Sequence, residues 1–174
     1  MQGDLSMPKK ITFGLSPTEI NNAIQELRKY QSEITYKCRK LAERLAEEGV
    51  YIARVKIAEY DAIYTGELLE SIKHEYGGVI QDGAKWIIYT GCPWAPFVEF
   101  GTGIVGSQNP HPDTSLANWK YDINEHGEAG WWYFNERDGK WHWTKGMPSR
   151  PFLYETGQEL RKVIQKVAKE VFSA

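Results

Sequence analysis

"SPTEINNAIQELRKYQSEITYKCRKLAERLAEEGVYIARVKIAEY", residues 16–60, decides the fold because it predicts one long helix. Ser16 suits the N-cap, Pro17 the first helical position and Glu19 the third position. In this arrangement the Ser16 hydroxyl caps the first turn, and the Glu19 carboxylate reaches back to the Ser16 amide. The sequence therefore fixes the start of the helix at Pro17.

Apolar residues follow this start at spacings that alternate between four and three, with Gln31 as the one polar interruption. They are Ile20, Ile24, Leu27, Ile34, Cys38, Leu41 and Leu45. The stripe is either a core-facing helix side or a coiled-coil seam. Gly49 either ends the helix or is crossed by it. The alternation at 54–57 also suits a strand, but the alanine content favours a helix to about Glu59.

Shorter patterns flank the long helix. An apolar/polar alternation at Ile11–Phe13 predicts an edge strand, and 71–76 and 85–90 predict two strands around a glycine-rich turn. "PWAPFVEFGTG" (93–103) predicts one short helix that Gly101 and Gly103 end. Residues 104–129 are polar and predict a long loop.

A second hairpin and a final helix complete the chain. Residues 131–135 and 140–144 flank Glu-Arg-Asp-Gly, a turn that predicts a hairpin. The last helix follows Pro151 and carries an apolar stripe of 3.6-residue period. The fold class is α+β, with the N- and C-terminal helices packed on one mostly antiparallel sheet of about four or five strands. We expect residues 1–15 to be an arm or edge strand and 16–174 to be a single domain with an aromatic-rich insert at 104–146.

Composition excludes several classes of protein. The 174 residues fit one domain, and 41% hydrophobic with 25% charged residues argues against disorder. A net charge of -2 argues against nucleic-acid binding by bulk electrostatics. The sequence has neither an apolar run of membrane-spanning length nor the apolar core of a signal peptide, so we expect synthesis in the cytoplasm and no membrane partner. Cys38 and Cys92 lack metal-site spacing and are expected to be free thiols.

The sequence contains no catalytic constellation. The four histidines are scattered without zinc-site spacing, so we expect ordinary surface or loop histidines. "GTGIVG" (101–106) lacks the Lys-Ser/Thr of a phosphate loop, and Ser71 lacks a nucleophile-elbow context. We therefore expect a protein that is not an enzyme, with no catalytic residue, no metal and no cofactor.

Residues 130–146, "GWWYFNERDGKWHWTKG", hold four of the seven tryptophans. Such aromatics bury in a core, hold a ligand or meet another protein. The stretch is similar to one copy of a choline-binding cell-wall repeat, which implies an aromatic cage for a quaternary ammonium. Such repeats stack in several copies, whereas this chain has a single one. A cell-wall, carbohydrate or choline-binding module is therefore the alternative function.

Three motifs in order point to a different family. They are "YTGELLESI" (64–72), "WAPFVEFGTG" (94–103) and "GMPSRPFLYE" (146–155). From about Ile34 to the C-terminus the chain resembles the bacteriophage tail-component family typified by the tenth structural gene product of a lambdoid siphophage. The motif residues are Thr65, Gly66, Leu68, Ser71, Glu99, Phe100, Gly101, Thr102, Gly103, Arg150, Pro151 and Phe152. Family members commonly read Pro-x-Asp-Thr-Gly where this chain has Asp61 to Gly66, so the turn there is shaped differently.

The resemblance implies a structural, non-catalytic role in the virion. It implies a head–tail connector, neck or tail-completion protein, made in the host bacterial cytoplasm, that forms a ring of six subunits or a multiple. The implied partners are further copies of the chain and other neck, tail or portal proteins. No sequence-specific recognition of nucleic acid is implied.

Two expectations concern particular side chains. Glu99 and Arg150 carry opposite charges in otherwise apolar motifs, which predicts a salt bridge between the central and C-terminal helices. Strand alternation places Trp131 and Tyr133 on one hairpin face and Trp132 and Phe134 on the other. We expect one face to pack on the long helix and the other to meet a neighbouring subunit. The expected interface residues are Trp131, Trp132, Tyr133, Phe134, Trp141 and Trp143.

Overall fold

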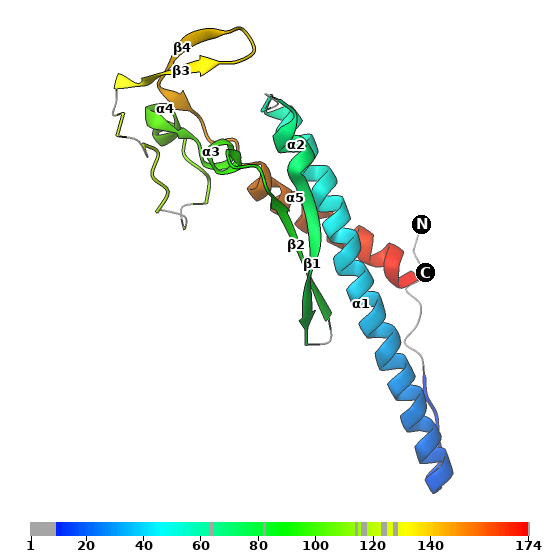
Figure 1. Cartoon of the computed structure of the whole chain (residues 1–174). Helices are drawn as coiled ribbons and strands as arrows, with labels where there is room; N and C mark the ends of the chain where they lie inside the picture. Colours follow the sequence, from blue (N-terminus) through cyan, green and yellow to red (C-terminus); the bar gives the residue numbers. More distant parts are fainter. Residues whose placement is uncertain are drawn as a thin grey trace, which may run out of the picture. The chain divides into compact units, whose positions relative to one another are not determined.

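The computed structural model describes residues 10–62, 65–81, 83–113, 115, 118–122, 125–126 and 129–173. The elements are α1 (Pro17–Glu59), α2 (Glu67–Ser71), β1 (Ile72–Ile80), β2 (Gly83–Thr90), α3 (Ala95–Phe100), α4 (Gly103–Gln108), β3 (Trp131–Asn135), β4 (Lys140–Thr144), β5 (Gly146–Met147) and α5 (Phe152–Ser173) (Figure 1). The predicted α+β class is confirmed. The sheet is smaller than predicted, because β1 and β2 form one two-stranded sheet and β3 and β4 form another.

The chain divides into two compact units. The first comprises the chain up to Glu48, His74–Ile87 and the chain from Arg161 onward. The second comprises Gly49–Lys73 and Ile88–Leu160, and it contains the aromatic hairpin and all of the motif residues.

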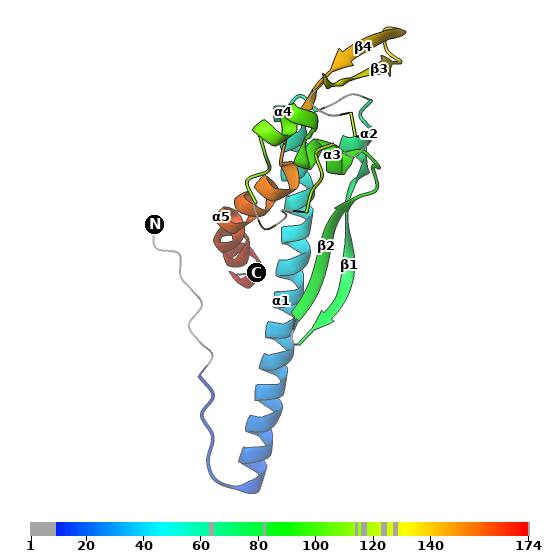
Figure 2. The same cartoon turned by 90° about the vertical axis from the view of Figure 1, so that its left-hand side faces the viewer.

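The helix α1 begins with the predicted capping box and runs unbroken for 43 residues (Figure 2). The Glu19 amide donates to Ser16 Oγ at 3.3 Å, and the Ser16 amide donates to the Glu19 carboxylate at 3.3 Å. The hydroxyl of Ser16 also donates to that carboxylate, and these bonds lower the pKa of Glu19. The prediction of a helix to Glu59 is confirmed.

The helix α1 continues through Gly49, and side chains of the second unit pack close to this glycine. A Cβ at this position would lie 2.3 Å from Ile88 Cδ1 and 3.1 Å from Leu160 Cδ1, so the ends of these two side chains would have to shift. The core consists of buried residues of α1, α2, β1, α3 and α5 and of the connection between β2 and α3, which are Ala53, Ile57, Leu68, Ile72, Cys92, Ala95 and Phe152. Burying such side chains stabilises the fold by about 1.5–3 kcal/mol for each large one.

In the first unit, β1 extends past the predicted strand end, because Gly77 and Gly78 lie within the strand rather than in the turn. The Trp86 ring packs against His74 at 5.3 Å and against Tyr76 at 5.7 Å between centroids. The expected edge strand at Ile11–Phe13 is wrong, since residues 10–14 have no regular structure. Without strand pairing, Phe13 stays exposed.

Gly66 begins the short helix α2 in the left-handed region, with φ 84° and ψ -14°. The Glu67 amide donates to Thr65 Oγ1 at 3.3 Å, although Gly66 rather than Thr65 is the N-cap residue of α2. A Cβ at this position would meet no atom within 4 Å, so backbone strain alone restricts the residue.

We therefore expect Gly66→Val to lower the free energy of unfolding by about 1–3 kcal/mol, through strain rather than collision. Gly66→Asn should cost clearly less, because asparagine tolerates the left-handed region. Urea unfolding of the three proteins measures the difference. Equal losses for valine and asparagine would show that the left-handed backbone is not the cause.

Candidate functional site

The predicted aromatic hairpin is confirmed residue by residue. β3 pairs antiparallel with β4, with Trp132 opposite Trp143 and Phe134 opposite Trp141. The turn closes through the Gly139 amide, which donates to the Asn135 carbonyl at 2.9 Å, and Gly139 has φ 66°. Next to the turn the Asp138 carboxylate bonds the His142 ring at 2.7 Å, which lowers the pKa of Asp138.

One face of the hairpin consists of four exposed aromatic side chains, which we call the aromatic face: Trp132, Phe134, Trp141 and Trp143. Their exposed fractions are 60%, 49%, 64% and 47%. Cross-strand partners pack edge to face, Trp132 on Trp143 at 5.4 Å and Phe134 on Trp141 at 5.6 Å between centroids. These contacts hold the rings in one arrangement while leaving about half of their surface in water.

The opposite face of the hairpin is turned toward the rest of the second unit. The Trp131 ring lies against Gly103 and against the ring of His126, with centroids 4.9 Å apart. Tyr133 stacks on His142 at 5.7 Å. The expected packing on the long helix is therefore wrong for Trp131, whose neighbours come from the segment that follows α3.

That segment is less loop-like than predicted. Gly103 begins the helix α4 rather than ending α3, and Gly101 alone ends α3 with φ 80°. The Trp119 indole donates to the Gly101 carbonyl at 3.0 Å, and the Gly103 amide donates to the Tyr121 carbonyl at 2.6 Å. Side chains and backbone of the polar stretch thus anchor the turn between the two short helices.

The motif glycines allow two backbone segments, Gly101–Gly103 and Gly146–Met147, to lie close together. We call this contact the glycine junction. Thr102 pairs with Met147 and Gly103 pairs with Gly146 as antiparallel bridges. A Cβ on Gly146 would lie 1.9 Å from the Thr102 carbonyl oxygen, and one on Gly103 would lie 2.4 Å from the Lys145 carbonyl oxygen. Side chains are therefore excluded at these positions.

Glu99 is buried and does not pair with Arg150. Its carboxylate accepts hydrogen bonds from the Leu153 amide at 2.9 Å and the Tyr154 amide at 3.0 Å, so it caps the first turn of α5. No ion pair between Glu99 and Arg150 occurs among the described residues, and the predicted salt bridge is wrong. The positive end of the α5 dipole takes the place of the expected guanidinium.

The third hydrogen-bond partner of the Glu99 carboxylate is His111. The sequence predicts an ordinary surface or loop histidine at this position. His111 is 7% exposed, and its Nε2 lies 3.2 Å from Glu99 Oε1. The Asp113 amide donates to His111 Nδ1 at 3.0 Å, so Nε2 carries the proton and donates to the carboxylate. The only sequence signal for this pair was the lone carboxylate in an apolar helix, which required a buried donor from elsewhere.

The remaining motif residues have structural roles. Leu68 and Phe152 belong to the core, and Ser71 Oγ bonds the Leu68 carbonyl at 2.8 Å and Thr90 Oγ1 at 2.6 Å. The Phe100 ring packs on His111 at 4.9 Å. Pro151 is buried directly before α5, which begins at Phe152.

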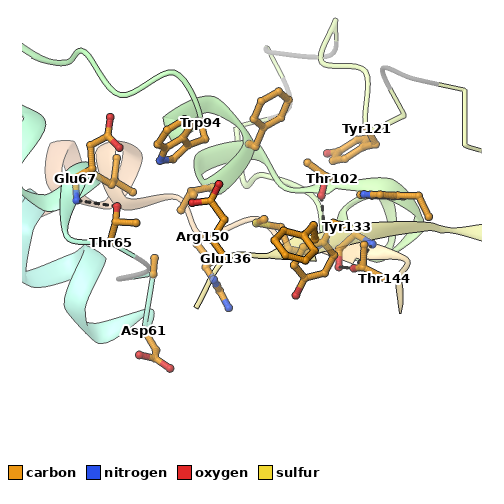
Figure 3. A pocket seen from close by; sticks show the side chains of 18 of the residues that line it. Asp61, Thr65, Glu67, Trp94, Thr102, Tyr121, Tyr133, Glu136, Thr144 and Arg150 are labelled. Atoms are coloured by element: carbon orange, nitrogen blue, oxygen red, sulfur yellow. Dashed lines mark hydrogen bonds between the residues drawn. The ribbon is translucent and has the colours of Figure 1, made fainter. Parts of the chain in front are cut away.

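Arg150 lines a hollow of about 1120 Å³ in the second unit. Its backbone is held by the Arg150 amide, which donates to the Val98 carbonyl at 2.9 Å. The side chains around the hollow come from the α2 and α3 regions, the glycine junction and the hairpin, and they include Thr65, Trp94, Thr102, Tyr133 and Glu136 (Figure 3). The mixture of aromatic, charged and hydroxyl groups suits a protein segment better than a small apolar ligand.

None of the helices in the described ranges has both the length and the apolar character that crossing a bilayer requires. Among the same residues, no group of three or more histidine, cysteine, aspartate or glutamate side chains is placed to hold a metal ion. No protein-family model, curated protein sequence or solved structure matches the chain.

Proposed function

We propose that this chain is a non-enzymatic structural protein of a tailed bacteriophage or prophage. In this proposal it acts at the head–tail junction or the tail end, as a ring-forming tail-completion or neck component of the virion. The observation that carries the proposal is the aromatic face, where four large rings are held in place by one another and remain about half exposed. Aromatic side chains in this state are typical of the centres of protein–protein interfaces.

The motif residues support a scaffold role for the rest of the unit. Glu99 fixes the start of α5, and the glycine junction fixes the segment that leads from the hairpin to that helix. The glycine junction thus joins the segment after the hairpin to the start of α4, and Glu99 joins α3 to α5. A contact between the aromatic face and a different surface of a neighbouring copy closes into a ring when the rotation fits.

We expect the wild-type chain to form oligomers whose population rises from micromolar to near-millimolar concentration. Trp132→Ala and Phe134→Ala should each weaken this association tenfold or more, on the order of the effect of interface hot spots. Light scattering behind a sizing column measures the masses. Tyr51→Ala, which removes a 65% exposed ring from α1, is the matched control and should leave the masses unchanged. A wild type that stays monomeric throughout, and that purified portal or tail tubes do not recruit, would contradict the ring.

A choline-binding module is the second candidate, supported by the density of aromatic rings on the hairpin. An aromatic cage holds a quaternary ammonium between the faces of separated rings. On the aromatic face each ring instead packs edge to face against its cross-strand partner, which favours a broad protein contact. Calorimetric titration with choline separates the two proposals, because saturable heat that Trp132→Ala abolishes would support the module.

A further inference from the structure

The first part of α1 is drawn in blue in Figures 1 and 2. It carries an apolar stripe whose side chains are exposed in the first unit. We call it the α1 seam: Ile20, Ile24, Leu27 and Ile34, with exposed fractions of 38%, 40%, 52% and 38%. By contrast, Leu41 and Leu45 further along the same stripe are partly covered within the chain. Ala23, beside the seam, is 6% exposed, so the lack of cover is confined to the four seam residues.

The spacing of the α1 seam identifies what covers it. With Ile24 and Gln31 at heptad positions a, residues Ile20, Leu27 and Ile34 fall at positions d. Side chains at positions a and d of one helix pack as knobs into the holes between side chains of the same spacing on a second helix. We propose that the α1 seam pairs with the α1 seam of a second copy of this chain, as a parallel, in-register coiled coil.

Two side chains decide the orientation. In a parallel pair Gln31 faces Gln31 of the second copy, so that each amide finds a partner; in an antiparallel pair it faces Leu27 and stays unsatisfied. In the parallel pair Arg28, at position e, lies opposite position g, which Ala23 occupies; Ala23 carries no charge and is 6% exposed within its own chain. The antiparallel pair sets Arg28 against Arg28, and like charges destabilise that arrangement.

The helix is prepared for this contact before a partner arrives. Its start is fixed by the Ser16–Glu19 capping box. Its later part is held within the unit, where Lys37 Nζ donates to the Phe172 carbonyl of α5 at 3.1 Å. Association therefore orders little backbone, and the usual minimum length for an isolated helix does not apply. With only four apolar residues in the seam, the contact is weak and concentration-dependent.

Disulfide trapping tests the register. In a Cys38→Ala background, Gln31→Cys places a thiol at the centre of the seam, and Ser32→Cys places one next to it on the outer side of the helix. Cys92 is retained because it is 4% exposed. With oxidised glutathione at about 100 µM protein, we expect covalent dimer from Gln31→Cys at least tenfold faster than from Ser32→Cys. Adding Ile24→Asp to the Gln31→Cys protein should remove this advantage, with circular dichroism confirming that the helix persists.

Equal rates from the two cysteine positions, or a rate that Ile24→Asp leaves unchanged, would overturn the proposal. The test is independent of the aromatic face. Trp132→Ala in the Gln31→Cys protein should still give the covalent dimer, even if that substitution abolishes larger oligomers. Loss of the ring with retention of the trapped dimer, or the reverse, therefore shows which of the two contacts is absent.

Discussion

Gly146→Ala is expected to lower the free energy of unfolding by roughly 2–6 kcal/mol, which is a large part of the stability of an ordinary domain. Gly146 has φ 100°, a conformation that costs any other residue about 1–3 kcal/mol. Its Cβ would also lie 1.9 Å from the Thr102 carbonyl oxygen and 2.5 Å from the Thr102 carbonyl carbon. Because both atoms belong to the backbone, no side chain can rotate to make room, and the glycine junction has to open.

Two further glycines separate strain from collision in the same measurement. Gly139 has φ 66° with no atom within 4 Å of an added Cβ, so Gly139→Ala should show strain alone, about 1 kcal/mol or slightly more. Gly157 lies in α5 with open space around it, and Gly157→Ala should stabilise the fold by up to about 1 kcal/mol. Denaturant unfolding of all three variants checks the order. A loss at Gly146 no larger than that at Gly139 would show that the junction yields without cost.

The elements that the sequence predicted best are those whose signals are local. The capping box at Ser16 and the Asp-Gly turn at Gly139 each involve residues at most four apart, and both appear as predicted. The helix α1 continues through Gly49, where the Ile88 and Leu160 side chains from distant parts of the sequence pack.

Contacts between distant segments account for the errors. The sequence pattern predicts that a helix ends at Gly103. In the structure Gly103 begins α4, and its backbone lies close to the Lys145 carbonyl at the glycine junction. The strand signals of β1 to β4 are correct, yet periodicity carries no information on whether hairpins join into one sheet. His111 lies in a polar stretch, and only the position of Glu99 in three dimensions explains its burial.

The motifs that suggested a functional site thus divide into two groups. Most of their residues build the scaffold: Leu68 and Phe152 fill the core, while Gly101 and Gly103 permit the close approach of backbone segments. Arg150 lines the hollow beside the hairpin, as do Thr65 and Thr102, but Arg150 alone of these three carries a charge. An interface that includes both the hollow and the aromatic face would combine a guanidinium with large rings, the residue types that dominate binding energy at protein contacts.

Glu99→Ala is expected to lower the free energy of unfolding by about 3–5 kcal/mol, the range for removing one partner of a buried charged group. The substitution leaves the His111 Nε2–H without an acceptor and removes the cap from the Leu153 and Tyr154 amides. Each buried donor left unsatisfied costs about 1–3 kcal/mol. Glu99→Gln keeps one acceptor oxygen for the α5 amides but turns a donor group toward other donors, so a smaller loss is expected.

A double-mutant cycle distinguishes this arrangement from the salt bridge that the sequence predicted. Urea unfolding of Glu99→Ala, His111→Ala and the double variant should give a coupling energy of about 1–3 kcal/mol, because the two side chains share a buried hydrogen bond. The same cycle with Arg150→Ala should give a coupling below about 0.5 kcal/mol, as for residues without a shared contact. A larger coupling to Arg150 than to His111 would restore the guanidinium as the partner of Glu99. With the expected result, Arg150 lines the hollow without Glu99 as its partner.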